Sequence, residues 1–270
     1  FGSSLTALLV LFHQQDVRQV YARRQQPGLR DWFADVQFLI CRPHQAAQVQ
    51  LASTFKGGNN GVNHNHNDLG TFTVLVDDCE LLTDPGAEVY TERTFSRQRY
   101  ESDLLNSYGH PVPVVAGQLQ VPDKQEYTVG VGQDVSTTVL ETHFGTDEDR
   151  VVMDLRGAYR VATLQKLIRT FTHSRAGDGV IEVVDEVAFA QPEAFATALI
   201  TYAAWRERAD GSLRIGDDGA AIDVRVTSAT AELVFEHCRI EESSTPMRLS
   251  WRLLNPALSA TVQITVTPVI

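Results

Sequence analysis

The spacing of hydrophobic and polar positions changes near residue 36. Before this point, apolar residues from Leu5 to Phe12 recur at the three- and four-residue spacing of one helix face. This pattern predicts a helix over residues 3–24, which the Pro-Gly pair at Pro27 ends. After residue 36, apolar and polar residues alternate in short runs, as expected for strands that are buried on one face.

These strand-like runs continue to the end of the sequence and are separated by Gly- and Asp-containing turns, such as Asp210-Gly211. Regular short strands with few helices predict a mainly β fold. We therefore expect a helical segment over residues 1–35, followed by a large antiparallel β-sandwich over residues 36–270. The predicted strands cover residues 36–41, 49–55, 72–76, 80–83, 137–142, 151–155, 162–171, 180–187, 196–202, 221–226, 233–236, 248–253 and 261–266.

One long interruption stands out in this strand pattern. Residues 87–110 are polar, rich in Arg and Tyr and only weakly periodic. Loops of this length in compact domains usually serve a function, so we expect this one to do so.

Composition and charge narrow the possible functions. The chain has 270 residues, 43% of them hydrophobic, and a net charge of −11. Nucleic-acid binding depends on an excess of Lys and Arg, so the charge argues against it. No apolar run approaches the roughly eighteen residues of a membrane span, so no membrane partner is expected. Three widely spaced cysteines without a Cys-x-x-Cys pair leave the cellular compartment open.

The candidate chemistry lies in the Gly- and Asn-rich run over residues 57–72. Here His64, His66 and Asp68 alternate with asparagines. In an extended strand, alternate side chains point to the same face, so all three would project to one side. Two imidazoles and a carboxylate on one face form a metal site or an acid/base site.

Two further readings of this run remain open. The spacing His64-x-His66-x-Asp68 is similar to that of metallo-β-lactamase-fold hydrolases, which favours a metal-dependent hydrolase built on these three residues. That pattern continues with another histidine, where this chain has Leu69. A non-catalytic carbohydrate-binding module is the other alternative, because β-sandwiches host both enzymes and binding modules.

An ordered set of motifs extends well beyond the histidines. It begins with residues 63–72, continues with Asp84-Pro85-Gly86 and Tyr90, and ends with Ser107-Tyr108-Gly109-His110, a Val-rich strand and Gly117-Gln118. In order and spacing this block resembles that of the heparinase II/III-like polysaccharide lyases over roughly sixty residues. The resemblance implies a supersandwich-like domain that follows an N-terminal α/α toroid. Residues 3–24 would then be the tail of that toroid.

The resemblance also implies a zinc site. Proteins of this family typically hold Zn²⁺ with the second histidine of the pair, the Asp of the Asp-Pro-Gly motif and the later histidine. In this sequence these residues are His66, Asp84 and His110. Neutral imidazoles and a carboxylate suit zinc, and three protein ligands leave one coordination position open.

The remaining site residues follow from the same resemblance. His64 would act in β-elimination on an acidic, uronate-containing polysaccharide, together with a tyrosine from the toroid domain of the same protein. We expect Arg97, Arg99 and Tyr100 to hold the substrate, because an arginine fork binds a carboxylate with two hydrogen bonds. Asp68 would orient an imidazole by hydrogen bonding. This chain alone should then be nearly inactive, and we expect a periplasmic or secreted protein.

Overall fold

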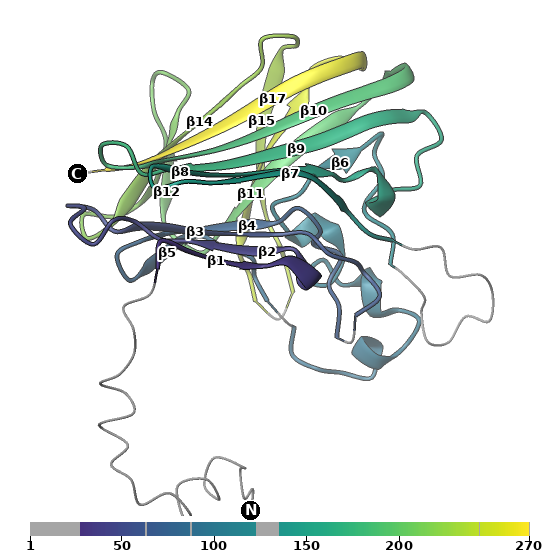
Figure 1. The fold of residues 1–270 in the computed structure, drawn as a ribbon. Helices are drawn as coiled ribbons and strands as arrows, with labels where there is room; N and C mark the ends of the chain where they lie inside the picture. Colours follow the sequence, from purple (N-terminus) through teal and green to yellow (C-terminus); the bar gives the residue numbers. More distant parts are fainter. Residues whose placement is uncertain (1–27, 63, 87, 123–134, 243, 270) are drawn as a thin grey trace, which may run out of the picture.

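The computed structural model describes residues 28–62, 64–86, 88–122, 135–242 and 244–269. Within them, the chain is mainly β and its strands pair antiparallel in three sheets (Figure 1). The predicted fold class, a mainly β structure with large antiparallel sheets, is confirmed. The helix predicted over residues 3–24 lies outside the described residues.

The first sheet has the order β1-β2-β3-β4-β5. Its strands are β1 (Arg30–Phe33), β2 (Phe38–Cys41), β3 (Leu51–Lys56), β4 (Phe72–Val76) and β5 (Cys79–Leu82). Short 3-10 helices lie between strands; these are η1 (Ala34–Val36), η2 (Arg93–Phe95), η3 (Arg99–Glu101), η4 (Ser107–Gly109) and η5 (Arg156–Ala158). Three of the five lie within the long polar loop predicted over residues 87–110.

The other two sheets contain the remaining strands. The eight-stranded sheet has, in spatial order, β12 (Trp205–Glu207), β13 (Leu213–Gly216), β14 (Ala221–Thr227), β17 (Ala257–Pro268), β10 (Val180–Glu193), β9 (Leu164–Ser174), β8 (Glu148–Asp154) and β7 (Thr138–Phe144). The four-stranded sheet has β15 (Leu233–Arg239), β16 (Met247–Leu253), β11 (Phe195–Thr201) and β6 (Val114–Val115). Each long strand predicted from the alternating pattern is present.

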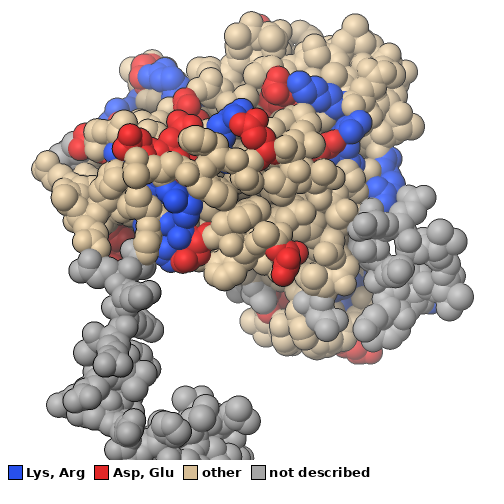
Figure 2. Space-filling view, viewed as in Figure 1, with Lys and Arg blue, Asp and Glu red and all other residues tan. Residues whose placement is uncertain are grey.

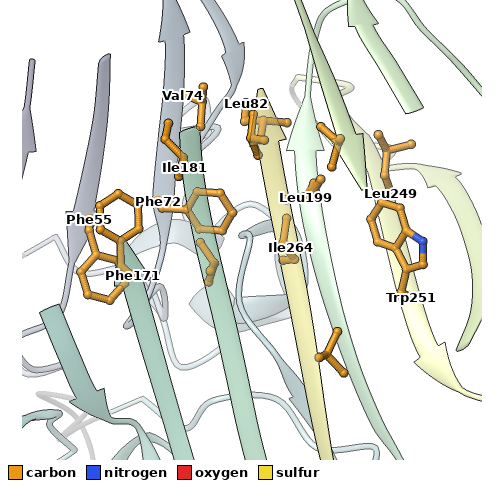
Figure 3. Close-up of a cluster of buried hydrophobic side chains, with 14 of the residues drawn as sticks. Phe55, Phe72, Val74, Leu82, Phe171, Ile181, Leu199, Leu249, Trp251 and Ile264 are labelled. Carbon is orange, nitrogen blue, oxygen red and sulfur yellow. The ribbon is translucent and has the colours of Figure 1, made fainter. Parts of the chain in front are cut away.

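The hydrophobic core lies between the five-stranded and eight-stranded sheets. Alternate residues of β3 and β4 are buried, as their sequence pattern predicts. Phe55 of β3 stacks on Phe171 of β9 with ring centroids 5.0 Å apart, and Phe72 of β4 contacts the same ring (Figure 3). Because burying one such side chain contributes about 1.5–3 kcal/mol, this apolar layer fixes how the sheets stack.

The five-stranded and four-stranded sheets meet at their edges. The main-chain nitrogen of Thr83, just after β5, donates to the carbonyl of Ile200 in β11 at 2.9 Å. The hydroxyl of Thr201 donates to the carbonyl of Leu81 at 2.7 Å. Residues of the four-stranded sheet, including Leu199 and Trp251, therefore belong to the same core (Figure 3).

The predicted boundary at residue 36 needs correction. Residues 30–33 form strand β1, which pairs with β2, so within the described residues the sandwich begins before residue 36. Trp32 packs on Phe144 across the sandwich, and Arg30 forms an ion pair with the buried Asp149. None of the four residues of β1 is buried, so its sequence shows no apolar face. Its contacts with β7 and β8, far away in the sequence, hold it in place. The short strands β12 and β13 were also missed.

A buried polar cluster lies between β3 and β9. The hydroxyl of Ser53 is 2.8 Å from Nδ1 of His173, and Arg175 pairs with the buried Asp149. Burial, aided by the positive charge of Arg175, lowers the pKa of His173 from 6.5 to about 4. The imidazole is therefore neutral in the folded protein at neutral pH.

The surface carries both signs of charge. On the face in Figure 2, Lys and Arg side chains are interspersed with Asp and Glu. Among the described residues, no helix has the length and apolar character needed to cross a membrane.

Acidification should destabilise the fold through His173. Its folded-state pKa of about 4 lies below the ordinary value of 6.5, so the unfolded chain binds the proton first. The contribution of the neutral His173 to the free energy of unfolding is therefore complete above about pH 6.5 and is lost as the pH falls toward 4. Between these values, the free energy of unfolding should fall by about 1.4 kcal/mol per pH unit.

Urea unfolding of the wild type and of His173→Asn measures this effect. The variant keeps a polar group beside Ser53 but cannot titrate. The stability difference between the two proteins should change by about 2 kcal/mol between about pH 7 and pH 5, to the disadvantage of the wild type. A difference that stays constant with pH would show that His173 does not titrate as described.

Candidate metal centre

Loops at one end of the five-stranded sheet bring three potential metal ligands together. His66 lies between β3 and β4, Asp84 follows β5, and His110 follows η4. One side-chain ligand atom from each residue lies within 4.8 Å of the others. In the part of the chain that the structure describes, this is the one group of three or more His, Cys, Asp or Glu side chains placed to share an ion.

The segment that carries His64 and His66 is a series of turns and not a strand. His64 has a φ of 57°, in the left-handed region, and the main-chain nitrogen of Lys56 bonds to the carbonyl of Thr71 at 3.0 Å. Because β3 and β4 are antiparallel neighbours, their connection must reverse direction. The prediction that His64, His66 and Asp68 share one side of an extended strand is therefore wrong.

Asp84 and His110 form the most buried part of the group. Nδ1 of His110 is 2.9 Å from Oδ1 of Asp84, and the hydroxyl of Thr71 donates to Oδ2 of Asp84 at 2.8 Å. Burial alone would raise the pKa of Asp84, but the charge and hydrogen bond of His110 outweigh it and hold that pKa well below its usual range. Burial likewise opposes protonation of His110, yet Asp84 outweighs it and raises the pKa of His110. Asp84 is therefore a carboxylate at neutral pH.

His66, in the connection between β3 and β4, is the third member of the group. Its ring centroid is 5.5 Å from that of His110. Burial, followed by the positive charge that His110 can carry, lowers the pKa of His66 to about 4. A neutral imidazole has a free nitrogen lone pair, which is the form in which histidine binds a metal.

The polar atoms of this group suit a metal ion. Nε2 of His110 is buried and has no hydrogen-bond partner among the described residues. Buried polar nitrogens are normally paired, so such an atom calls for a ligand, a water or an ion. Two imidazoles and one carboxylate are a donor set that Zn²⁺ commonly takes, with a fourth position left open. The residues therefore fit the zinc expected from the sequence.

The position of His110 is set by close backbone contacts around it. A Cβ atom on Gly109 would lie 1.9 Å from the carbonyl oxygen of Asp103, so only glycine fits there. Arg248 donates to the carbonyls of Tyr108 and His110, and its guanidinium lies 4.4 Å from the centre of the Tyr108 ring. These contacts hold the Ser-Tyr-Gly-His motif in place, and the side chain of His110 is fully buried.

The carboxylate of Asp68 forms an ion pair with a lysine. Both carboxylate oxygens lie 2.6 Å from Nζ of Lys56 at the end of β3. The expectation that Asp68 orients an imidazole is therefore wrong. Its place in a ligand set with His64 and His66 is wrong as well, because the described metal group takes only His66 of the three. No sequence signal marked Lys56, whose partner lies in a turn twelve residues later.

The three expected substrate-binding residues differ in how they are placed. Arg99 donates to the carbonyl of Asn65 through two nitrogens, at 2.9 and 3.3 Å, and to the carbonyl of Thr94 at 2.9 Å. Its guanidinium lies 5.7 Å from the centre of the Tyr100 ring, which is half-buried. Arg99 therefore ties the long loop to the histidine segment. Arg97 is exposed on the same loop.

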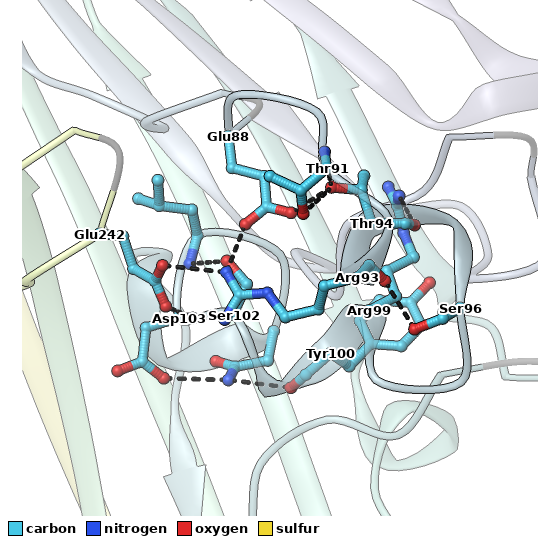
Figure 4. Close-up of polar contacts among 12 residues, drawn as sticks. Glu88, Thr91, Arg93, Thr94, Ser96, Arg99, Tyr100, Ser102, Asp103 and Glu242 are labelled. Atoms are coloured by element: carbon cyan, nitrogen blue, oxygen red, sulfur yellow. Dashed lines mark hydrogen bonds and ion pairs between the residues drawn. The ribbon is translucent and has the colours of Figure 1, made fainter.

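A second set of contacts holds the long loop to the hairpin between β15 and β16 (Figure 4). Arg93 forms ion pairs with the buried Glu88 at 2.7 Å and with Glu242 at 3.0 Å. Glu242 also accepts a hydrogen bond from the main-chain nitrogen of Asp103 at 3.2 Å, and Thr94 donates to Glu88. The sequence marked this loop as functional but gave no sign of these partners.

His64 lies outside the metal group, on the surface. Its ring is nearly parallel to that of Tyr90, with centroids 6.3 Å apart, and Tyr90 meets Phe95 edge-on at 5.4 Å. Tyr90 and Phe95 are 52% and 56% exposed. Exposed aromatic side chains gathered in one place are typical of binding surfaces. This end of the sandwich thus combines a partly buried candidate metal centre with an exposed histidine.

Comparison with known proteins gives a likeness in structure only. No protein-family model matches the sequence, and no curated protein matches it. A heparinase III structure superposes with a TM-score of 0.69 at 14% identity, covering 91% of this chain and 37% of the other. Heparan sulfate lyase HepC from Pedobacter heparinus superposes with a TM-score of 0.70 at 13% identity, covering 97% of this chain and 40% of the other.

The chain thus spans well under half the length of the lyases that it matches. A structural likeness at such low sequence identity establishes the fold and not the activity. The resemblance expected from the ordered motifs and the resemblance in structure point to the same group of proteins by independent routes. The described chain therefore has the fold of a part of heparinase III and of heparan sulfate lyase HepC, and its expected resemblance to heparinase-like polysaccharide lyases is confirmed.

Proposed function

We propose that this chain is the zinc-binding β-sandwich domain of a polysaccharide lyase that cleaves uronate-containing chains by β-elimination. The observation that carries this proposal is the convergence of His66, Asp84 and His110 beside an exposed His64, on a lyase-like fold. The lyases in the comparison act on heparan sulfate or heparin by their names.

His66, Asp84 and His110 would hold the zinc. The neutral state of His66, the ionised state of Asp84 and the unpartnered Nε2 of His110 support this assignment. Bound there, zinc would join three loops and supply one Lewis-acidic position at the edge of the site.

His64 would act on the substrate. In β-elimination, a base removes the proton from C5 of the uronate, the C4–O bond breaks and the leaving oxygen takes up a proton. A histidine suits either proton transfer because small changes in its surroundings set its charge near neutral pH. Its exposure and its position outside the ligand group support this role.

The C5 proton becomes acidic enough only when the adjacent carboxylate is neutralised. We assign this contact to Arg97, which is exposed on the loop beside the site. Arg99 and Tyr100, expected from the sequence to share it, would act mainly by holding the loop against the histidine segment, because Arg99 already donates to two main-chain carbonyls.

We infer that a second catalytic group comes from outside this chain. The two proton transfers take place at different atoms, C5 and the leaving oxygen, and we assign one of them to His64 and the other to a separate group. In our proposal, an α/α toroid domain of the same protein supplies a tyrosine and the opposite wall of the site. An enzyme of this kind would meet its polysaccharide in the periplasm or outside the cell.

A carbohydrate-binding module without catalysis is the second candidate function. The exposed Tyr90 and Phe95 favour it, because aromatic rings stack on the apolar faces of sugars. Such a module would bind the polysaccharide and release no unsaturated product.

Zinc binding should depend on the three ligands and not on His64. We expect His66→Ala or His110→Ala to reduce the zinc content to near zero, because two remaining ligands hold zinc weakly. His64→Ala and Asp68→Ala should retain zinc. Metal analysis of the purified proteins after dialysis measures this. Loss of zinc in Asp68→Ala but not in Asp84→Ala would support the hydrolase-like arrangement instead.

Lyase activity should require His64 and the longer protein. In a full-length protein, His64→Ala should lower turnover by roughly a hundredfold or more, the usual range for a general acid or base, with zinc still bound. Residues 1–270 alone should be nearly inactive, because the substrate would be poorly positioned. The rise in ultraviolet absorbance from unsaturated uronate products reports both rates.

Each other outcome has a clear meaning. Cleavage without an absorbance rise would indicate hydrolysis, and binding without turnover in the full-length protein would indicate the carbohydrate-binding module. Full lyase activity from residues 1–270 would show that the site is complete within this chain.

A further inference from the structure

A single buried arginine connects the sandwich core to two loops of the metal centre. Arg169 lies on β9, its side chain is fully buried, and it faces Asp185 on the neighbouring strand β10. Nε and Nη2 of Arg169 donate to the two carboxylate oxygens of Asp185, each at 2.7 Å. This two-pronged contact fixes the plane and the direction of the guanidinium.

The remaining nitrogen points at the metal-centre loops. Nη1 donates to the carbonyl of Gly70 at 2.7 Å and to the carbonyl of Pro111 at 2.8 Å. Gly70 precedes Thr71, whose hydroxyl binds Asp84, and Pro111 follows His110. One nitrogen atom thus holds two segments that approach the site from different parts of the chain.

Every donor of this guanidinium is used. Nη2 also donates to the hydroxyl of Thr197 on β11 at 3.1 Å, so the five N–H groups of Arg169 have five acceptors. A lysine has one nitrogen and cannot reach a carboxylate on one side and two carbonyls on the other in a fixed plane. The arrangement therefore requires arginine and not merely a positive charge.

The close approach of Gly70 to this arginine depends on its missing side chain. Gly70 has a φ of +90°, and a Cβ atom there would lie 2.8 Å from Leu155 and 3.6 Å from Cδ of Arg169. The loop carbonyl reaches the guanidinium because both the backbone conformation and the space suit only glycine.

We propose that Arg169, oriented by Asp185, is a positioning residue of the metal centre. It sets the separation between the segment that carries His66 and the segment that carries His110, and it does so from behind the site without touching the ion. This inference rests on the proposed zinc site. It adds to that site a buried arginine that lies outside the ordered motifs of residues 63–118. The sequence separation of Arg169 from Gly70 is 99 residues.

Gln120 provides a second link between these segments, because its main-chain nitrogen donates to the hydroxyl of Ser107 at 2.8 Å and its side chain binds Leu69. The side chain of Gln120 accepts from the main-chain nitrogen of Leu69 at 3.0 Å and donates to its carbonyl at 2.7 Å. Loss of Arg169 therefore loosens the site without separating the loops. Removal of such outer contacts typically lowers metal affinity by about 10- to 100-fold.

The test compares two double variants of the full chain that remove a buried ion pair. Arg169→Met/Asp185→Leu removes the proposed support without leaving a buried charge unpaired. The control, Arg175→Met/Asp149→Leu, removes the buried pair between Arg175, just after β9, and Asp149 on β8. Arg175 there holds the carbonyls of Leu29 and Arg42, away from the metal loops, and Arg30, the other partner of Asp149, is partly exposed to water. Arg169→Lys tests geometry against charge.

Two measurements apply to each protein. Competition with a chelator gives the zinc affinity, and hydrogen–deuterium exchange of the metal-free protein gives the protection of residues 64–71 and 107–112. We expect the 169/185 variant to lose about 10- to 100-fold in zinc affinity and to exchange faster in both segments together. Arg169→Lys should behave in the same way, and the 149/175 control should match the wild type in both.

The outcomes separate this inference from the proposed function. If the wild type binds no zinc, the proposed metal site fails, and the exchange data alone decide whether Arg169 holds the two segments together. If the wild type binds zinc and both double variants lose equal affinity, the effect is general destabilisation and the inference is wrong. Unchanged affinity and exchange in Arg169→Lys would also overturn it.

Discussion

Close packing between the five-stranded and eight-stranded sheets is the constraint on which the rest of the structure depends. The stacked rings of Phe55 and Phe171 join β3 to β9, and buried positions follow the alternation along both strands. With the sheets fixed, the end of β3, the start of β4 and the end of β5 must lie at one end of the sandwich. The connections that leave there carry His66 and Asp84 to the same place.

The same packing places charge where water cannot reach it. The core holds two buried ion pairs, Arg169 with Asp185 and Arg175 with Asp149. Such pairs repay their desolvation only when their remaining hydrogen bonds are satisfied. Arg169 satisfies its own by binding loop carbonyls, so the cost of burying a charge is offset by contacts that also order the loops around the candidate metal centre.

The long loop over residues 88–110 has anchors that do not need a metal. Arg99 bonds it to the histidine segment, and Arg93 bonds it to Glu242. The protein contacts show that the loop has its own support, so a metal there would chiefly arrange His66 and His110 around the open side where His64 lies.

What the sequence determined by itself was the alternation of strands and the identity of the candidate metal ligands. Period-two patterning is local, because it reflects which face of each strand is buried, and it predicted the long strands and the sandwich. The ordered motifs brought His66, Asp84 and His110 into one hypothesis, and the structure places their ligand atoms within 4.8 Å of one another. Strand β1, in which no residue is buried, carries no such pattern and escaped prediction.

Only the tertiary structure decided the remaining features, because each depends on partners far away in the sequence. The histidine segment looks extended when read alone, but the antiparallel neighbours β3 and β4 force it to turn. Asp68 pairs with Lys56, and Arg99 binds main-chain carbonyls, which have no residue identity that a sequence could reveal. The charge states of His66 and Asp84 follow from burial and proximity, and these exist only once the sheets have packed.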